Sequence, residues 1–164
     1  MSVITQRMCG QLSGDFVVFL IGMRVNRWWK PWTWWRVGAA MPRMVQELTA
    51  HPELGYLGGE SWFGRTTVMV QYWRSMAELL AYAKKRDAEH LPAWRAFNKL
   101  VGTGGDVGIW HETYRVRAGD HESVYVNMKP FGLGKAGQSV EASGRRQDAE
   151  GRLAEGGSAS TQPG

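Results

Sequence analysis

The sequence predicts one α+β domain with the ferredoxin-like, split βαβ order, over about residues 15–134. Three observations predict this class. The length of 164 residues fits one domain, and 43% hydrophobic residues are enough for a core. Stretches rich in β-branched and aromatic residues alternate with stretches of helical periodicity. Their order along the chain is β-α-β-β-α-β, with a short extra strand at the end.

The first strand is predicted at residues 15–25, the most apolar stretch of the chain. Because successive strand residues point to opposite faces, one face carries only apolar side chains. These are Val17, Phe19, Ile21, Met23 and Val25. The other face carries Phe16, Val18, Leu20, Gly22, Arg24 and Asn26. It becomes polar towards Asn26, and we expect that end of the sheet to open onto a pocket.

The remaining elements follow in order. A helix is predicted from about Thr33 to Ala50, kinked or restarted near Pro42, because proline lacks the N–H that an interior turn requires. Ser75 and Glu78 form a capping box for a second helix. Another helical piece is expected at about residues 88–101. Further strands are predicted at residues 54–62, 66–73 and 106–116, and a shorter strand or arm at 122–128.

Both ends of the chain are expected to lie outside the domain. Residues 1–14 read as a flexible leader. Residues 135–164 contain no aromatic residue and are rich in Gly, Ser, Ala, Gln and charge. Such a segment cannot offset its ordering entropy by burial, so a disordered tail is predicted.

Composition argues against several classes of protein. The net charge is +5, but the basic residues are scattered among acids, so no nucleic-acid partner is expected. The apolar run at residues 16–25 is too short to cross a bilayer as a helix, so stable membrane insertion is not expected. The single cysteine, Cys9, excludes an intramolecular disulfide framework and fits a cytoplasmic protein.

Nine tryptophans are present, and five of them lie between residues 28 and 35. Large aromatic side chains can form the walls of a pocket for a flat apolar ligand. They are also common in cores and dimer interfaces. A third interpretation is contact with a membrane surface, since Arg27 and Lys30 flank the cluster; that requires the rings to be exposed together.

Several blocks of the chain resemble a known family. These are FVVFLIGMRVNRWWKP, GRTTVMVQYWRS, HLPAWRAFN, GDVGIWHETYRV and NMKPFGLGKAG. They resemble a bacterial and fungal domain-of-unknown-function family described as monooxygenase-like, of the fumagillin-biosynthesis monooxygenase type. The resemblance implies a homodimer of the dimeric α+β-barrel superfamily, in which two sheets pack face to face. It also implies a cavity between each sheet and its helices.

Two of the four histidines are candidates for chemistry, although none has the spacing of a metal-binding motif. The pKa range of histidine suits His111 as a general acid or base; a hydrogen bond between barrels is the alternative. Adjacent strand residues face opposite ways, so His111 and Glu112 cannot form a dyad. The resemblance to haem-binding members of this fold implies His90 as a proximal ligand, with Asn26 and Tyr82 in loosely similar places.

Three functions remain open. The first is a monooxygenase-like enzyme without a cofactor, acting on an apolar aromatic or polyketide-like small molecule. Its base would be His111 or His90, its polar anchors Asn26, Arg24 and Tyr72, and its walls Trp28, Trp73, Trp94 and Trp110. The second is a haem-binding protein, or a haem-dependent dehydratase or oxygenase, with His90 on the iron. The third is a non-catalytic dimer that binds small molecules.

Overall fold

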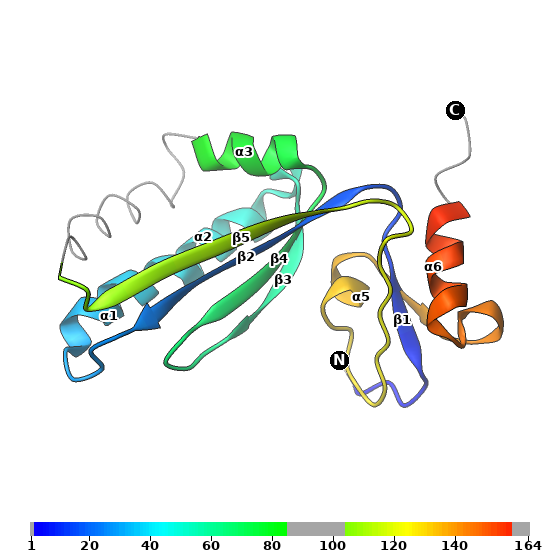
Figure 1. Ribbon diagram of the computed structural model, residues 1–164, viewed down its shortest axis with the longest axis horizontal. Coiled ribbons are helices and arrows are strands. Elements are labelled where there is room, and N and C mark those ends of the chain that lie inside the picture. The colour runs from blue at the N-terminus through cyan, green and yellow to red at the C-terminus, as the bar shows by residue number, and fades with distance from the viewer. Residues whose placement is uncertain (1, 85–103, 159–164) are drawn as a thin grey trace.

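The computed structural model describes residues 2–84 and 104–158 of the chain. Its main sheet has four antiparallel strands in the order β3-β4-β2-β5, formed by Tyr56–Trp62, Val68–Trp73, Phe16–Val25 and Val107–Val116. Helices cover one face of this sheet, and a smaller unit lies at the other end of the molecule (Figure 1). The predicted α+β class and ferredoxin-like strand order are confirmed.

The predicted first helix is two helices, α1 (Pro31–Gly38) and α2 (Ala40–Ala50), and the break lies at Ala39 rather than at Pro42. Pro42 lies in the first turn of α2, where a backbone N–H has no partner inside the helix. A proline is therefore tolerated there without a kink.

A continuous core lies between the sheet and the helices. Its most buried members are Leu48 of α2 and Trp73 of β4, each 1% exposed. The rest of this cluster is Val17, Met44, Leu79 and Tyr82. Val17 and Trp73 are register partners on β2 and β4, so the helix-covered face is the all-apolar face predicted for the first strand.

A buried amide lies within this core. Gln71 is 1% exposed; its Oε1 accepts a hydrogen bond from Trp73 Nε1 at 2.9 Å, and its Nε2 donates to Met69 Sδ at 3.3 Å. Buried polar groups are costly unless they are hydrogen-bonded. These bonds along β4 fix the Trp73 indole and fill the centre of the helix-covered face.

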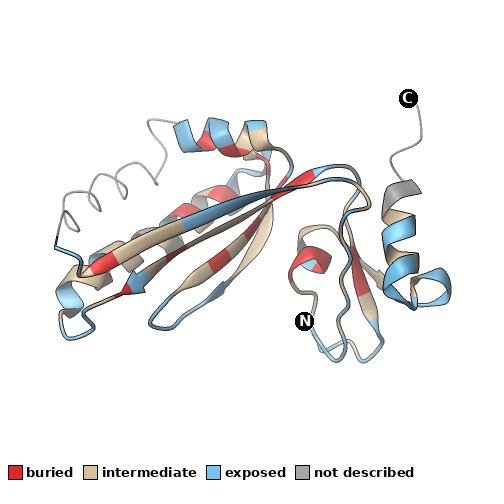
Figure 2. Ribbon diagram, viewed as in Figure 1, coloured by how far each residue is buried: buried red, intermediate tan, exposed pale blue. Residues whose placement is uncertain are grey.

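Apart from the four-residue α5 (Leu133–Ala136) at one corner, the opposite face of the sheet carries no helix in the part of the chain that the structure describes. The register places Val18, Leu20, Val70, Trp110, Glu112 and Tyr114 on this face. One corner of it is covered, since Trp62 contacts Phe131 at 5.9 Å between ring centroids and Lys135 Nζ lies 3.0 Å from Glu60 Oε1. The remainder is half-buried or exposed (Figure 2).

The two ends of the chain differ from the sequence expectation. Residues predicted as leader and tail contain β1 (Met8–Gln11) and β6 (Gln138–Glu141), which pair with each other. Short helices, α5 (Leu133–Ala136) and α6 (Ala149–Ser158), and the 3-10 turns η1 (Pro52–Leu54) and η2 (Gly144–Arg146) complete the chain. The pairing uses backbone hydrogen bonds, which a composition poor in aromatics does not reveal.

The predicted fifth strand is not a member of the main sheet. Residues 122–128 form only isolated bridges, Met8 with Tyr125 and Ile4 with Met128. The helical piece expected at residues 88–101 lies outside the described residues. Within residues 2–84 and 104–158, no helix combines the length and apolar character that crossing a membrane requires.

Helix α3 (Met76–Lys84) begins at the predicted capping box. The Glu78 N–H donates to Ser75 Oγ at 3.2 Å, and Ser75 Oγ donates to Glu78 Oε2 at 2.8 Å. Since α3 supplies Leu79 and Tyr82 to the core, its first turn determines how the core is closed.

We expect Ser75→Ala to lower the free energy of unfolding by about 1 kcal/mol, because it removes an N-cap. Urea denaturation followed by circular dichroism measures this change. Ser75→Thr keeps the hydroxyl and should lose much less. Equal losses in the two variants would contradict the capping role of the hydroxyl.

Candidate functional site

An apolar pocket of about 450 Å³ lies at the end of the sheet where β2 leads into α1. Met23 and Val25 of β2 form its floor, and Trp28, Trp34 and Phe63 form its walls. The β3–β4 turn closes the remaining side with Gly64, Arg65 and Thr67. Ligand pockets in proteins commonly have about this volume and a mainly apolar lining, so this pocket is the candidate site.

The polar groups of the pocket come from the β3–β4 turn. Thr67 Oγ1 accepts a hydrogen bond from the Met23 N–H at 3.0 Å, which ties the turn to β2. Arg65 Nε donates to the Val25 carbonyl at 3.2 Å, and no carboxylate within the described residues pairs with its guanidinium. Arg65 Nη2 also donates to the Asn26 carbonyl at 3.4 Å, so backbone carbonyls hold the guanidinium at the edge of the apolar pocket.

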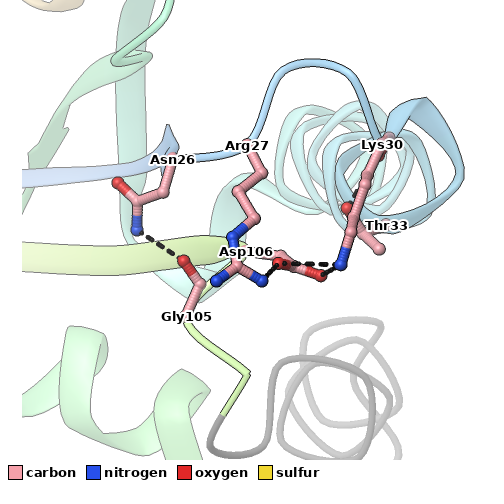
Figure 3. A network of polar contacts seen from close by, with 6 residues as sticks. All are labelled: Asn26, Arg27, Lys30, Thr33, Gly105 and Asp106. Carbon is pink, nitrogen blue, oxygen red and sulfur yellow. Dashed lines mark hydrogen bonds and ion pairs between the residues drawn. The ribbon is translucent and has the colours of Figure 1, made fainter.

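The tryptophan-bearing turn before α1 is held by one carboxylate (Figure 3). Asp106, at the start of β5, accepts from Arg27 Nη1 at 2.7 Å and from Lys30 Nζ at 3.1 Å. The hydrogen bond from Lys30, and then the one from Arg27, hold the pKa of Asp106 below its usual value. Asp106 therefore stays ionised and keeps both cations in place around Trp28.

Hydrogen bonds from helix α1 also hold the Trp28 wall in place. Trp34 Nε1 donates to the Trp28 carbonyl at 3.3 Å, and Thr33 Oγ1 donates to the Lys30 carbonyl at 2.8 Å. Pro31 is the first residue of α1, where its fixed φ suits a helix start. These contacts hold two aromatic walls against each other.

His111 lies on the helix-covered face of β5, where it is the register partner of Ile21. Its ring centroid is 5.8 Å from that of Phe19. Met23, in the pocket floor, is two residues beyond Ile21, so His111 lies one row of side chains, about 7 Å, from the pocket. A ligand that extends past Met23 would reach it.

Glu112 points to the opposite face, as the strand alternation predicts, and Tyr114 Oη donates to Glu112 Oε2 at 2.6 Å. This hydrogen bond raises the pKa of the Tyr114 phenol above its ordinary value. His111 and Glu112 are not brought together.

Arg24 and Asn26 do not line the pocket, because they alternate along the strand with Met23 and Val25 of its floor. Arg24 Nη1 donates to Thr66 Oγ1 at 2.8 Å, and Asn26 Nδ2 donates to the Gly105 carbonyl at 3.1 Å. The Asn26 side chain points towards Gly105 in Figure 3. In this conformation both residues hold neighbouring segments together, and their roles as polar anchors stay predictions.

Tyr72 and Trp110 lie on the face without helices. Burial raises the pKa of Tyr72 above its ordinary value. Trp110 packs over Gly22, where an added Cβ would lie 2.9 Å from Trp110 Nε1 and would collide with the Thr67 carbonyl. Trp110 Nε1 is buried and has no hydrogen-bond partner among the described residues. These two residues are separated from the pocket by the sheet.

Trp73 and Tyr82 belong to the packed core rather than to the pocket. Their ring centroids are 5.6 Å apart, and Tyr82 Oη donates to Glu47 Oε2 at 2.8 Å. Of the predicted wall residues that the structure describes, Trp28 alone lines the pocket. Sequence reasoning missed Trp34, Phe63 and Arg65; the signal for Phe63 and Arg65 was their place beside the predicted turn.

His90 and Trp94 lie outside the described residues, so their predicted roles and the haem hypothesis stay predictions. Among the described residues, no group of three His, Cys, Asp or Glu side chains could hold a metal ion. A second cavity, of about 80 Å³, lies beside Cys9 and His121 in the smaller unit. It is well below the usual size of a substrate site.

Comparison with known proteins gives three results. A family model described as "Monooxygenase af470-like" matches residues 16–133. Monooxygenase af470 of Aspergillus fumigatus is 28% identical over an alignment of 154 residues, which covers 84% of this chain and 51% of that protein, so this chain spans about half of its length. SnoaB of Streptomyces nogalater, described as a cofactor-independent oxygenase, is 16% identical with a TM-score of 0.45, over 63% of this chain and 94% of SnoaB.

We expect Asp106→Asn to loosen the turn at residues 26–33, because neither Arg27 nor Lys30 keeps an ionic partner there. Hydrogen exchange of these amides should become several-fold faster, while the amides of α3 keep their rates. Asp120→Asn, in an exposed turn, is the matched control.

Amide exchange at residues 26–33 should also depend on pH, because the ion pairs require an ionised Asp106. Because the pKa of Asp106 is lowered in the folded chain, its contribution is present above the ordinary aspartate pKa, near 4, and is lost as the pH falls through the lowered value. The protection factors of wild-type residues 26–33, which correct for the intrinsic pH dependence of amide exchange, should therefore fall in acid and approach those of Asp106→Asn. Identical exchange in both proteins at neutral pH would contradict the clamp.

Proposed function

The chain belongs to the monooxygenase af470-like family, and from this premise we propose that it is a small oxygenase for an apolar aromatic or polyketide-like molecule. The observation that carries the proposal is the pocket of about 450 Å³ between Trp28, Trp34 and Phe63. Flat aromatic walls favour a flat, fused-ring ligand, since aromatic rings stack or pack edge to face. The Arg65 guanidinium suits a ligand that carries an oxygen anion in the reaction.

The proposed chemistry needs few protein groups. A substrate with an acidic CH₂ beside a ketone loses a proton to a base, and Arg65 stabilises the resulting enolate. The carbanion reduces dioxygen by adding to it, and the hydroperoxide then loses water. In balance, R₂CH₂ and O₂ give R₂C=O and H₂O, so the substrate supplies all the electrons. The apolar lining favours this sequence because it keeps the reacting carbon beside hydrocarbon rather than beside other polar groups.

Among the described residues, His111 is the base that this proposal assigns. It shares the helix-covered face with the pocket floor and lies one row of side chains from Met23. His111 is exposed on that face, and its imidazole packs beside the ring of Phe19.

A homodimer is part of this proposal. The sheet face without helices presents Val18, Leu20 and Val70 between the half-buried Trp110 and the exposed Tyr114. A face of this composition is suited to packing against a second copy. That arrangement would leave the pocket, on the other face, open to its ligand.

We expect Trp34→Ala to weaken binding of a flat ligand about 10- to 100-fold, because it removes one aromatic wall. Anthrone is a suitable probe, since it has three fused rings and a CH₂ that ionises to an aromatic enolate. Titration calorimetry measures the affinity. Trp62→Ala, on the opposite face, is the control and should bind as the wild type does. Equal weakening in both variants, or no binding by the wild type, counts against the pocket.

We expect His111→Ala to lower kcat for oxygen uptake with anthrone by about 10²- to 10⁴-fold while leaving anthrone affinity unchanged, the effect of removing a general base. An oxygen electrode measures the rate, and anthraquinone and water are the expected products. His51→Ala is the control, because His51 is exposed and pairs with Glu53 at 2.8 Å. A wild-type rate in His111→Ala would exclude His111 as the base.

A further inference from the structure

The end of the sheet that carries the pocket also exposes an unusual set of aromatic side chains. Trp28, Trp29, Trp32 and Trp35 are 68%, 57%, 65% and 69% exposed, and Phe63 is 86% exposed. We call these five residues the aromatic surface. Its members come from α1, from the turn before α1 and from the β3–β4 turn. These segments meet at one end of the main sheet, where the Val25 N–H donates to the Arg65 carbonyl (Figures 1 and 2).

The aromatic surface does not contribute to the folded core. Helix α1 contains no buried residue, and Trp32 and Trp35 lie one turn apart on one side of it. Trp34, on another side, faces the pocket. Trp28 and Trp29 pack edge to face against each other, with centroids 6.2 Å apart. Clusters of large exposed aromatic side chains mark sites of contact with another molecule or a membrane.

Charge around the aromatic surface is strongly one-sided. Between residues 16 and 46 the chain has five basic residues and no acid, and between residues 61 and 73 it has Arg65 and no acid. Asp106 alone opposes them in the first part of β5, and it is already held by Arg27 and Lys30. Arg36 is exposed on α1, with no ion pair among the described residues.

We propose that the aromatic surface docks on the anionic surface of a lipid bilayer, peripherally and without crossing it. Indole rings are apolar with one polar N–H and are enriched at the level of the lipid headgroups, where basic side chains meet anionic lipid. Each basic residue close to such a surface raises the affinity about five-fold. Charge complementarity therefore favours lipid as the partner over a second copy, which would bring like charges together.

This inference goes beyond the proposed function and does not depend on it. It does connect with it through geometry, because Trp28 and Phe63 belong both to the aromatic surface and to the pocket. A docked molecule would place the opening of its apolar pocket next to the bilayer, in which apolar small molecules dissolve.

Cosedimentation of the full chain with vesicles tests the proposal without substrate. Vesicles of 70% phosphatidylcholine and 30% phosphatidylserine are compared with vesicles of phosphatidylcholine alone, at about 0.1 M and 0.5 M NaCl. We expect binding to the anionic vesicles at low salt, at least 10-fold weaker binding by Trp32→Ser/Trp35→Ser, and about five-fold weaker binding by Arg36→Gln. Val126→Ser, 52% exposed in the smaller unit, is the control and should bind as the wild type does.

Each other result overturns the proposal. These results are absent binding by the wild type, equal binding to neutral vesicles, and wild-type binding by Trp32→Ser/Trp35→Ser. Light scattering without lipid tests the alternative partner, which is a second copy of the chain. A lower mass for that double variant than for the wild type would identify the aromatic surface as a contact between copies. Neither tryptophan is buried, so an unchanged circular dichroism spectrum and urea midpoint show that the double variant is folded; Arg36→Gln gives the same test with a single exposed change.

Discussion

The ion pairs of Asp106 with Arg27 and Lys30 are the constraint on which the functional end of this molecule depends. They join the start of β5 to the turn after β2, two segments 76 residues or more apart in sequence. An exposed ion pair contributes little to stability, but two cations on one carboxylate with 17% of its side chain exposed restrict geometry. The turn must therefore leave β2 in one direction, and that direction places Trp28 beside Trp34.

Because of this constraint, the two ends of the helix-covered face of the sheet have different functions. On the helix-covered face, the closed end is filled by Trp73, Tyr82 and Leu48, whereas the end beyond Met23 is left open. At the closed end, the aromatic rings fill the space and leave no room for a ligand. At the open end, the aromatic rings lie outside the packed core cluster. Identical residue types thus serve stability at one end and access at the other, according to how far the helices extend over the sheet.

The sequence carries enough information for the strands, because the pattern of β2 and β5 is set by local alternation. The predicted first strand begins one residue before the observed one, and the Ser75 cap has the predicted contacts. The pocket walls depend instead on how a hairpin turn folds back towards α1. Phe63 and Trp34 are 29 residues apart, and no local pattern states that they meet. The sequence also predicts that Arg24 gives the pocket a polar face. In the structure its side chain donates a hydrogen bond to Thr66 instead, a contact that no local pattern reveals.

Helix α1 is short and exposed, so contacts with the rest of the chain must hold it in place. Eight residues are too few to form a stable helix alone, and α1 buries no residue of its own. Its position is fixed by Thr33, Trp34 and the Asp106 clamp, none of which involves Trp32 or Trp35. About two thirds of each of those two side chains is exposed, so polar residues there would cost little in packing. The choice of indole there is therefore not explained by folding, and a contact outside the chain, rich in hydrocarbon and in negative charge, accounts for both the rings and the basic residues around them.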